Sequence, residues 1–302
     1  MNAPSSRASA AYLLLATATL LWAGNPVAGR IIAPDTSPIA VAFLRWALAL
    51  PILYLFVADE LRSNAPLIRS RWRFLALMGL LSTAPNHALV YWGLHHTTAI
   101  NVQLFNSIIP VLVILMQWMF LKMRPNRSEW VGVSVSMVGV LVIISAGEFA
   151  RLARLDLNFG DLLVLATFVS WSAYSVLLRF RPTELSPFAF IFVAASFGAT
   201  ALFPVFILDW LILGHALPGA DWQVWSWILF IVIGSGVLAP ALHSAGIDRI
   251  GPTRGSLFLH LIPIFGVGIA MAVLGEAFHR FHAVGFALVL LGLMIANQSR
   301  RA

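Results

Sequence analysis

Ten apolar stretches, each long enough to cross a lipid bilayer, constrain what this chain can fold into. A membrane-spanning helix needs about 20 apolar residues, because each residue rises about 1.5 Å through a hydrocarbon core roughly 30 Å thick. The sequence predicts such helices over residues 11–31, 38–58, 73–93, 98–121, 129–147, 160–180, 187–209, 223–246, 254–275 and 281–298. We therefore expect an all-α membrane protein with ten transmembrane helices.

The composition agrees with a place in a membrane. Of the 302 residues, 60% are hydrophobic and only 10% are charged, which is too little charge to cover a soluble domain. The chain has no cysteine, so disulfides and cysteine-ligated metals are excluded. The first apolar run follows Arg7, as in a signal peptide, but it continues to about Ile32 and many spans follow. We therefore expect a retained first helix.

The distribution of Lys and Arg predicts how the chain crosses the membrane. With the N-terminus placed in the cytoplasm, 14 of the 19 basic residues fall in cytoplasmic segments and four fall on the other side. Such a bias is typical of cytoplasmic loops, so the net charge of +7 gives no signal for a nucleic-acid partner. We expect both termini to be cytoplasmic and the number of spans to be even.

The sequence also repeats itself. Residues 93–140 match residues 246–293 at an offset of 153, and residues 12–56 match residues 161–205 at an offset of 149. The matches fall on Trp, Pro, Gly and Arg as well as on Leu, although chance matching among leucine-rich segments is the alternative.

The repeat divides the chain into two halves of five helices, residues 1–150 and residues 151–302. Because five is odd, the second half enters the membrane from the opposite side. We therefore expect the two halves to be inverted copies, related by an axis in the membrane plane.

A family resemblance follows from these features. Two inverted five-helix halves, the stretch Trp22-Ala-Gly-Asn25 and the spans around Pro110 and Pro263 resemble the drug/metabolite transporter (DMT) superfamily, EamA type, over the whole chain. The sequence is most similar to bacterial YddG-type exporters of aromatic amino acids. The resemblance implies a ten-helix basket, a central cavity lined by the first, third, fourth, sixth, eighth and ninth helices, and export from the cytoplasm. The Gly-Glu pair common at the end of the family's fourth and ninth spans is kept at Gly275-Glu276 but not at Lys122-Met123.

The fourth span carries a stripe of polar residues. Gln103, Asn106, Pro110 and Gln117 lie within about 60° of one another on a helix. Pro110 also removes the hydrogen bond to the Asn106 carbonyl, which leaves an acceptor beside an amide side chain. This pattern predicts either a substrate path or interhelical hydrogen bonding with a proline kink.

Other spans carry polar and aromatic groups of the same kind. For each single histidine, a structural role is as good an interpretation as contact with a ligand. Trp22 and Trp171 are related by the repeat, and they either line a cavity or pack the interface between the halves. The predicted substrate-binding residues are Trp22, Asn25, His87, Tyr91, Gln103, Asn106, Trp171, Tyr174, Ser175, His243, Ser256 and His260, and the predicted hinges are Pro26, Pro85, Pro110, Pro240 and Pro263.

The absence of acidic residues from the middle of the spans also constrains function. No Asp or Glu lies in the middle of a span, whereas proton-coupled carriers usually place a carboxylate there. We therefore expect a facilitator, or an exporter with weak coupling. The single deep basic residue, Arg45, has a neutral repeat partner, Ala194. Arg45 either snorkels toward the interface or pairs with helix-end carbonyls or with the C-terminal side of a neighbouring helix.

The predicted function is export of small neutral or zwitterionic metabolites, with aromatic amino acids and related compounds favoured. Amide, hydroxyl and imidazole groups suit such solutes better than phosphate-bearing ones, which favour Arg or Lys. The chain carries none of the common catalytic motifs, so we expect no enzyme activity, no cofactor and no metal. Alternatives are an exporter of other metabolites or drugs, a histidine-based intramembrane enzyme or metal-binding protein, and a channel-like pore. We expect a multi-pass protein of a bacterial inner membrane, a monomer or weak homodimer.

Overall fold

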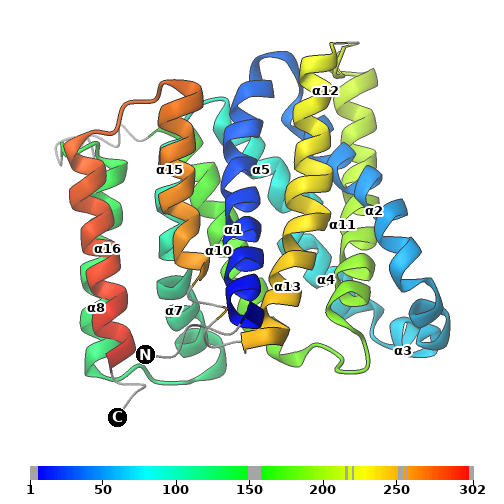
Figure 1. Ribbon diagram of the computed structural model, residues 1–302, viewed down its shortest axis with the longest axis horizontal. Helices are drawn as coiled ribbons and strands as arrows, with labels where there is room; N and C mark the ends of the chain where they lie inside the picture. The colour runs from blue at the N-terminus through cyan, green and yellow to red at the C-terminus, as the bar shows by residue number, and fades with distance from the viewer. Residues whose placement is uncertain are drawn as a thin grey trace.

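The computed structural model describes residues 6–148, 158–214, 217–219, 221–250, 255 and 258–298. Within these residues every regular element is a helix and no strand occurs. Eight of the helices are long and apolar enough to cross a membrane, and the two shorter apolar helices Phe258–Leu274 and Arg280–Ala296 follow them. The elements run roughly parallel or antiparallel to one another in a single bundle (Figure 1).

The first half of the chain contains one short surface helix and the segments predicted as spans one to five. Its elements are α1 (Ser6–Ile32), η1 (Ala33–Asp35), α2 (Pro38–Ser63), α3 (Ala65–Ser70), α4 (Trp72–Ser82), α5 (Ala84–Leu94), α6 (Ala99–Phe105), η2 (Asn106–Ile108), α7 (Ile109–Leu121) and α8 (Arg127–Ile144). The predicted third span is therefore two helices, α4 and α5, and the predicted fourth span is α6, η2 and α7.

The second half contains the segments predicted as spans six to ten. Its elements are α10 (Phe159–Leu177), η3 (Leu178–Phe180), α11 (Pro187–Leu211), α12 (Trp222–Leu229), η4 (Phe230–Leu238), α13 (Ala239–Ile250), η5 (Phe258–His260), α15 (Leu261–Leu274) and α16 (Arg280–Gln298). The predicted eighth span is α12, the π-helical segment η4 and α13.

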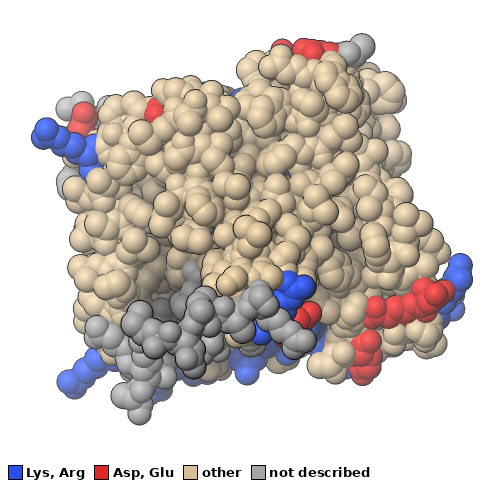
Figure 2. Space-filling view, viewed as in Figure 1, with Lys and Arg blue, Asp and Glu red and all other residues tan. Residues whose placement is uncertain are grey.

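We call the end of the bundle at which α1 begins and α16 ends the terminus end, and the other the opposite end (Figure 1). Figure 2 shows that the Lys, Arg, Asp and Glu side chains of the visible face lie toward these two ends, with a broad uncharged band between them. A band of this kind is what a lipid bilayer requires of the surface that it contacts.

Local sequence signals explain where several helices begin. Ser37 and Ser186 each precede a proline and accept hydrogen bonds from the first turn of α2 and α11. Asn126 and Glu129 form a capping box at the start of α8, in which each side chain accepts from the other residue's backbone N–H. These caps satisfy backbone donors that a helix cannot pair internally.

Helices α8 and α16 pack closely at one edge of the bundle (Figure 1). A β-carbon on Gly139 would lie 2.5 Å from the carbonyl oxygen of Gly285, and one on Gly132 would collide with the carbonyl of Gly292. Glycines of α8 and α16 therefore pack against each other, because only glycine allows two backbones to approach so closely.

At the other edge, α2 and α11 run side by side in opposite directions, with α3 beside the terminus end of α2 (Figure 1). Ser37, at the start of α2, donates to Asp209 near the end of α11. Glu60, near the end of α2, accepts from the backbone N–H and the hydroxyl of Ser186 at 2.6 and 2.7 Å. The two pairs are reciprocal, since each residue of one pair lies 149 positions from its counterpart in the other.

Candidate functional site

Four of the five predicted hinge prolines lie where a span changes its helical geometry. Pro85 is the second residue of α5, directly after the break that ends α4. Pro110 is the second residue of α7 and follows the 3-10 turn η2, and Pro240 is the second residue of α13 after the π-helical segment η4. Pro263 lies in the first turn of α15 after η5. Pro26 differs, because α1 continues through it without a break.

These breaks have a chemical consequence. A proline cannot donate a hydrogen bond to the carbonyl four residues earlier, so each break leaves backbone acceptors without their helical partners. Half-buried polar side chains lie close to three of the breaks in sequence, namely His87, Asn106 and His243. Irregular backbone at membrane depth is tolerated where protein or a water-filled cavity surrounds it.

A buried polar cluster joins α1, α2 and α5. The Nη1 atom of Arg45 donates to the side-chain oxygen of Asn25 at 2.9 Å and to the hydroxyl of Tyr91 at 3.1 Å. The Tyr91 hydroxyl donates to the same oxygen of Asn25 at 3.0 Å. Arg45 is 6% exposed and Tyr91 is 2% exposed, whereas Asn25 is half-buried. Arg45 therefore does not snorkel and does not pair with helix-end carbonyls. It pairs instead with side chains in the C-terminal halves of two neighbouring helices, α1 and α5.

His87 lies next to this cluster. Its Nδ1 atom is 2.8 Å from the carbonyl oxygen of Thr83, which requires Nδ1 to carry the proton when the ring is neutral. The indole nitrogen of Trp46, 3.4 Å from the same Nδ1 atom, is then a packing neighbour, and the two rings meet edge to face with centroids 5.7 Å apart. This tautomer leaves Nε2 of His87 as a hydrogen-bond acceptor.

Trp22 and His243 form a second group, between α1 and α13. The indole N–H of Trp22 donates to the carbonyl of Ser235, within η4, at 3.1 Å. The Trp22 and His243 rings lie 5.1 Å apart, and the Nε2 atom of His243 is buried without a hydrogen-bond partner. A buried ring nitrogen with no partner is a site at which a solute or a water molecule would gain a hydrogen bond.

Gln103 holds three helices together. Its amide nitrogen donates to the carbonyl of Ala23 in α1 at 2.7 Å, and the side chain is 1% exposed. A β-carbon on Gly266 of α15 would collide with this amide. Gln103 therefore occupies a packed position between α1 and α15, which is the interhelical bonding that the sequence allowed as an alternative.

At the opposite end of the bundle, hydrogen bonds tie other helices to the end of α5 and the start of α6. Arg30 of α1 donates to the carbonyl of Leu94. Glu276, beyond the end of α15, accepts from the backbone N–H groups of Ala99 and Ile100 at 2.9 Å each. A carboxylate at these two donors caps the start of α6 and complements the helix dipole.

The sixth span is tied to the same segment. Asp161 of α10 is 2% exposed and accepts from the hydroxyl of Thr97 and from the amide of Asn101. Asn158 caps α10 and donates to the carbonyl of His96 at 2.9 Å. The first, sixth and ninth spans thus contribute hydrogen bonds to residues 94–101, which include the start of the fourth span.

His95 lies within residues 94–101, outside the membrane-spanning helices. Burial is the main reason that its pKa is lowered from the ordinary value for histidine, and the neighbouring His96 and Arg30 lower it further. His95 is therefore neutral at neutral pH.

At the terminus end a hollow of about 570 Å³ opens beside α7. It is lined by Trp118, Met119, Lys122 and Arg124. Lys122 takes a left-handed backbone conformation (φ 57°), which ends α7 in the same way that Gly275 (φ 66°) ends α15. The described residues contain no group of three or more His, Cys, Asp or Glu side chains that could hold a metal ion.

The sequence of this helical bundle matches a known protein family over both halves of the chain. The model of the EamA-like transporter family matches residues 9–145 and residues 158–298. The chain belongs to the EamA-like transporter family. It is thus a multi-pass membrane protein of a family of transporters.

Several relatives are similar over most of their length. "Uncharacterized transporter YyaM" of Bacillus subtilis is 26% identical, with 86% of this chain and 85% of that protein covered. An "Uncharacterized transporter" of Archaeoglobus fulgidus is 26% identical over 96% of this chain and 98% of its own. A "Probable terminal-alkyne amino-acid exporter" of Streptantibioticus cattleyicolor is 24% identical over 74% and 72%. One crystal structure has the same fold, with a TM-score of 0.57, 21% identity and coverage of 97% and 98%.

The remaining predicted binding residues of this EamA-like transporter fall into several environments. Trp171 is 37% exposed, and its ring lies 5.0 Å from that of Tyr174, which is buried. The Ser175 hydroxyl donates to the Trp171 carbonyl at 2.8 Å, so it is used within its own helix. His260 is exposed, at the end of η5. Ser256 lies outside the described residues.

For two residues of this EamA-like transporter, Arg45 and Glu276, the sequence did not predict the contacts that make them functional candidates. Arg45 was recognised as deep, but its partners Asn25 and Tyr91 come from two other helices and could not be paired with it from spacing. Glu276 was recognised as part of a Gly-Glu pair, but its contact with α6 joins residues 177 positions apart. A charged residue within or at the end of a span was the available signal for both.

Proposed function

We propose that this EamA-like transporter exports small zwitterionic metabolites, with aromatic amino acids and related compounds as the favoured class. Export would run from the cytoplasm across the inner membrane of a bacterium, with both chain termini cytoplasmic. The mechanism would be alternating access between residues 1–150 and residues 151–302, acting as two inverted halves without strong coupling to protons.

The observation that carries this proposal is the set of broken spans. Four spans change helical geometry at Pro85, Pro110, Pro240 and Pro263, and these spans or the helices packed against them carry the polar side chains of the candidate site. Discontinuous helices in corresponding positions of two halves are the usual construction of a transporter's substrate site.

The reciprocal contacts support the two inverted halves. The Ser37–Asp209 and Glu60–Ser186 pairs exchange partners between α2 and α11, as a two-fold axis in the membrane plane would require. The glycines of α8 and α16 pack in the same reciprocal way. Rocking of one half against the other about such interfaces is the common motion of these folds.

The two ends of the bundle support the direction of opening. Hydrogen bonds from residues in or beside three spans, the first, sixth and ninth, hold residues 94–101 at the opposite end, whereas a hollow opens beside α7 at the terminus end. The excess of Lys and Arg in segments of the terminus end supports a cytoplasmic location for that end.

Two further observations support the proposed class of solute and transport without strong coupling to protons. One relative bears the name of an amino-acid exporter, and the side chains at the breaks are amides and imidazoles that suit an uncharged or zwitterionic solute. The buried carboxylates Asp161 and Asp209 lie within one turn of a helix end, so neither occupies the membrane midplane where a proton carrier is usual.

Flux measurements test the proposal. Purified protein is reconstituted in liposomes loaded with unlabelled phenylalanine, and uptake of labelled phenylalanine is followed with and without a pH gradient. We expect saturable counterflow without the gradient. Flux that requires an imposed proton gradient would contradict the facilitator mode, and non-saturating flux would favour a pore.

Variants test the site. Asn106→Leu removes a half-buried amide, and we expect counterflow to fall roughly two- to tenfold, the effect of one lost hydrogen bond of about 0.5–1.5 kcal/mol. Trp171→Ala is expected to act in the same direction. Leu55→Ala is the control, because Leu55 is 78% exposed on the apolar helix α2, away from the candidate site residues of the bundle interior. Wild-type flux in both site variants would remove these two residues from the path.

A further inference from the structure

Arg45 is a buried cation without a counter-ion. It lies seven residues after the start of α2, about 10 Å along the helix, and its side chain is 6% exposed. Both of its hydrogen-bond partners, Asn25 and Tyr91, are uncharged. Among the described residues no carboxylate forms an ion pair with Arg45, and its Nε atom is buried with no partner.

Such an arrangement is costly in a membrane. A charge removed from water must be compensated by an opposite charge or by a full set of hydrogen bonds, and an isolated cation at membrane depth is rare for this reason. Two neutral acceptors satisfy one nitrogen of the guanidinium and leave Nε unpaired. The cluster therefore carries one uncompensated positive charge, which an anionic group would neutralise.

The partners of Arg45 are arranged so that donors remain available. The side-chain oxygen of Asn25 already accepts from both Arg45 and Tyr91, so this contact fixes the orientation of the amide. The amide nitrogen of Asn25 is thereby left as a donor without an acceptor among the described residues, and Asn25 is half-buried rather than enclosed. A guanidinium and an amide N–H together match the two oxygens of a carboxylate.

The neighbouring histidine offers the complementary group. His87 uses its Nδ1 atom on the Thr83 carbonyl, which leaves Nε2 as an acceptor on a half-buried ring. The His87 and Tyr91 rings have centroids 6.3 Å apart, so the acceptor and the guanidinium cluster belong to one region of the bundle. A solute with a carboxylate and an ammonium group could engage both.

We infer that Arg45, together with Asn25, binds the carboxylate of the transported solute, so that this transporter selects solutes that carry a carboxylate. The inference rests on the proposed transport function, since it specifies which chemical group of the solute the protein recognises. Arg45 supplies the charge, Asn25 and Tyr91 hold the guanidinium in place, and His87 accepts from a neighbouring ammonium group.

Three phenyl compounds of similar size distinguish recognition of a carboxylate from recognition of an ammonium group. Phenylalanine carries both charges, phenylacetate carries only the carboxylate, and phenethylamine carries only the ammonium group. Binding to purified wild-type protein is measured as a shift in melting temperature, and a dissociation constant is derived from the dose dependence. We expect stabilisation by phenylalanine and phenylacetate and none by phenethylamine.

Two variants identify Arg45 as the cause. Arg45→Lys keeps the charge but loses the planar fork, and we expect about a tenfold weaker affinity for both carboxylates. Asn25→Asp places a carboxylate beside Arg45 and keeps an acceptor for Tyr91. It is expected to raise the melting temperature of the free protein and to abolish binding of phenylacetate, because the internal carboxylate now occupies the site of the external one.

The outcomes distinguish this inference from the proposed function. Equal stabilisation by all three compounds, or unchanged phenylacetate affinity in Asn25→Asp, would overturn the inference while counterflow of amino acids still supported export. Arg45-dependent binding of phenylacetate in a protein that shows no amino-acid counterflow would keep the carboxylate site and reject amino-acid export.

Discussion

The hydroxyl of Ser37, which caps the first turn of α2, donates to the buried carboxylate of Asp209 near the end of the antiparallel helix α11. The counterpart contact joins Glu60 of α2 to Ser186, which caps α11. Each helix start is therefore held by an acidic residue from the end of the other helix. These contacts therefore hold the two antiparallel helices together near both of their ends.

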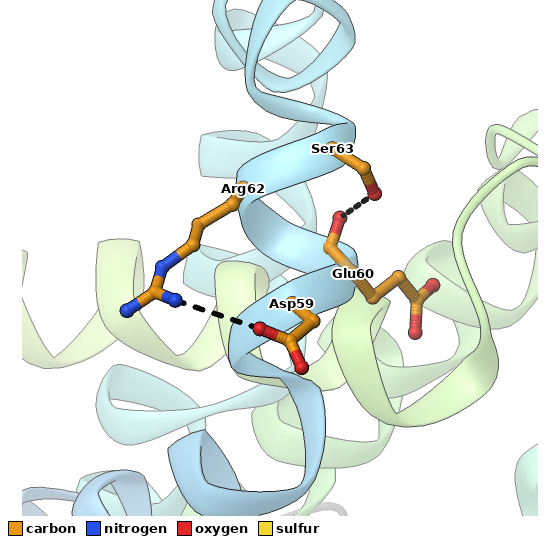
Figure 3. A network of polar contacts seen from close by, with 4 residues as sticks. All are labelled: Asp59, Glu60, Arg62 and Ser63. Atoms are coloured by element: carbon orange, nitrogen blue, oxygen red, sulfur yellow. Dashed lines mark hydrogen bonds and ion pairs between the residues drawn. The ribbon is translucent and has the colours of Figure 1, made fainter.

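Removing the charge of Glu60 should weaken that edge. Glu60→Gln loses a charge-assisted pair of hydrogen bonds to Ser186, and we expect the free energy of unfolding in detergent to fall by about 1–3 kcal/mol. Asp59→Asn is the matched control one residue away. Figure 3 shows Asp59 directed toward Arg62, at 3.5 Å, while the Glu60 carboxylate points away from Arg62.

The Asp59–Arg62 pair is 99% and 73% exposed, so its loss should change stability by less than about 1 kcal/mol. If the two variants unfold at the same denaturant concentration, the interhelical cap contributes nothing beyond a surface charge.

The spans themselves were predictable because length and apolar composition decide them. The start of α11 at Pro187 agrees with the predicted span, and the end of α2 at Ser63 lies beyond the predicted residue 58 because Asp59, Glu60 and Arg62 continue the helix past the apolar run. The prolines predicted interruptions but not their form. Whether a break becomes a 3-10 turn, as at Asn106–Ile108, or a π-helix, as at Phe230–Leu238, depends on packing against other spans.

The partners of polar residues were less predictable than the residues themselves. Helical spacing places side chains on one face of one helix, but the Arg45 cluster combines three helices. The stripe of the fourth span divides in the structure for the same reason. Gln103 is 1% exposed and packs against Gly266, whereas Pro110, two turns later, is exposed.

The α8–α16 contact should tolerate no side chain at its glycines. Gly139→Ala would bring a β-carbon to 2.5 Å from the Gly285 carbonyl oxygen, which requires the two backbones to separate. We expect a loss of about 1–3 kcal/mol in unfolding free energy, as for overpacked cores. Gly268→Ala in α15 is the control, because a β-carbon there would meet nothing within 4 Å and alanine favours the helix. Equal melting temperatures for both variants would contradict the packing argument.

Glu276 should control access from the opposite end. Because it accepts from Ala99 and Ile100, Glu276→Ala is expected to weaken closure by about 1–3 kcal/mol, which corresponds to a roughly 5–150-fold shift in population. The chain has no cysteine, so Asn106→Cys gives a single reactive site without background. A membrane-impermeant maleimide added outside oriented vesicles should label this cysteine faster when Glu276 is also replaced.

Glu129→Ala is the control for that experiment, since Glu129 caps α8 near the terminus end. It should leave labelling from the opposite side at the level of the Asn106→Cys protein. Equal labelling rates with and without Glu276 would mean that its cap stabilises α6 without closing the bundle.

His95 should make stability fall at mildly acidic pH. Its pKa is lowered in the folded protein, mainly by burial and then by His96 and Arg30, so the unfolded chain binds the proton first as pH decreases. The stabilising contribution is complete above the unfolded pKa of about 6.5 and is lost as pH falls from that value through the lower pKa of the folded protein. Melting temperatures between pH 7.5 and 5.5 should therefore decrease less in His95→Asn than in the wild type. His96→Asn should keep most of the decrease, because burial of His95 is the larger cause, and a slope in His95→Asn equal to that of the wild type would assign the acid sensitivity to another group.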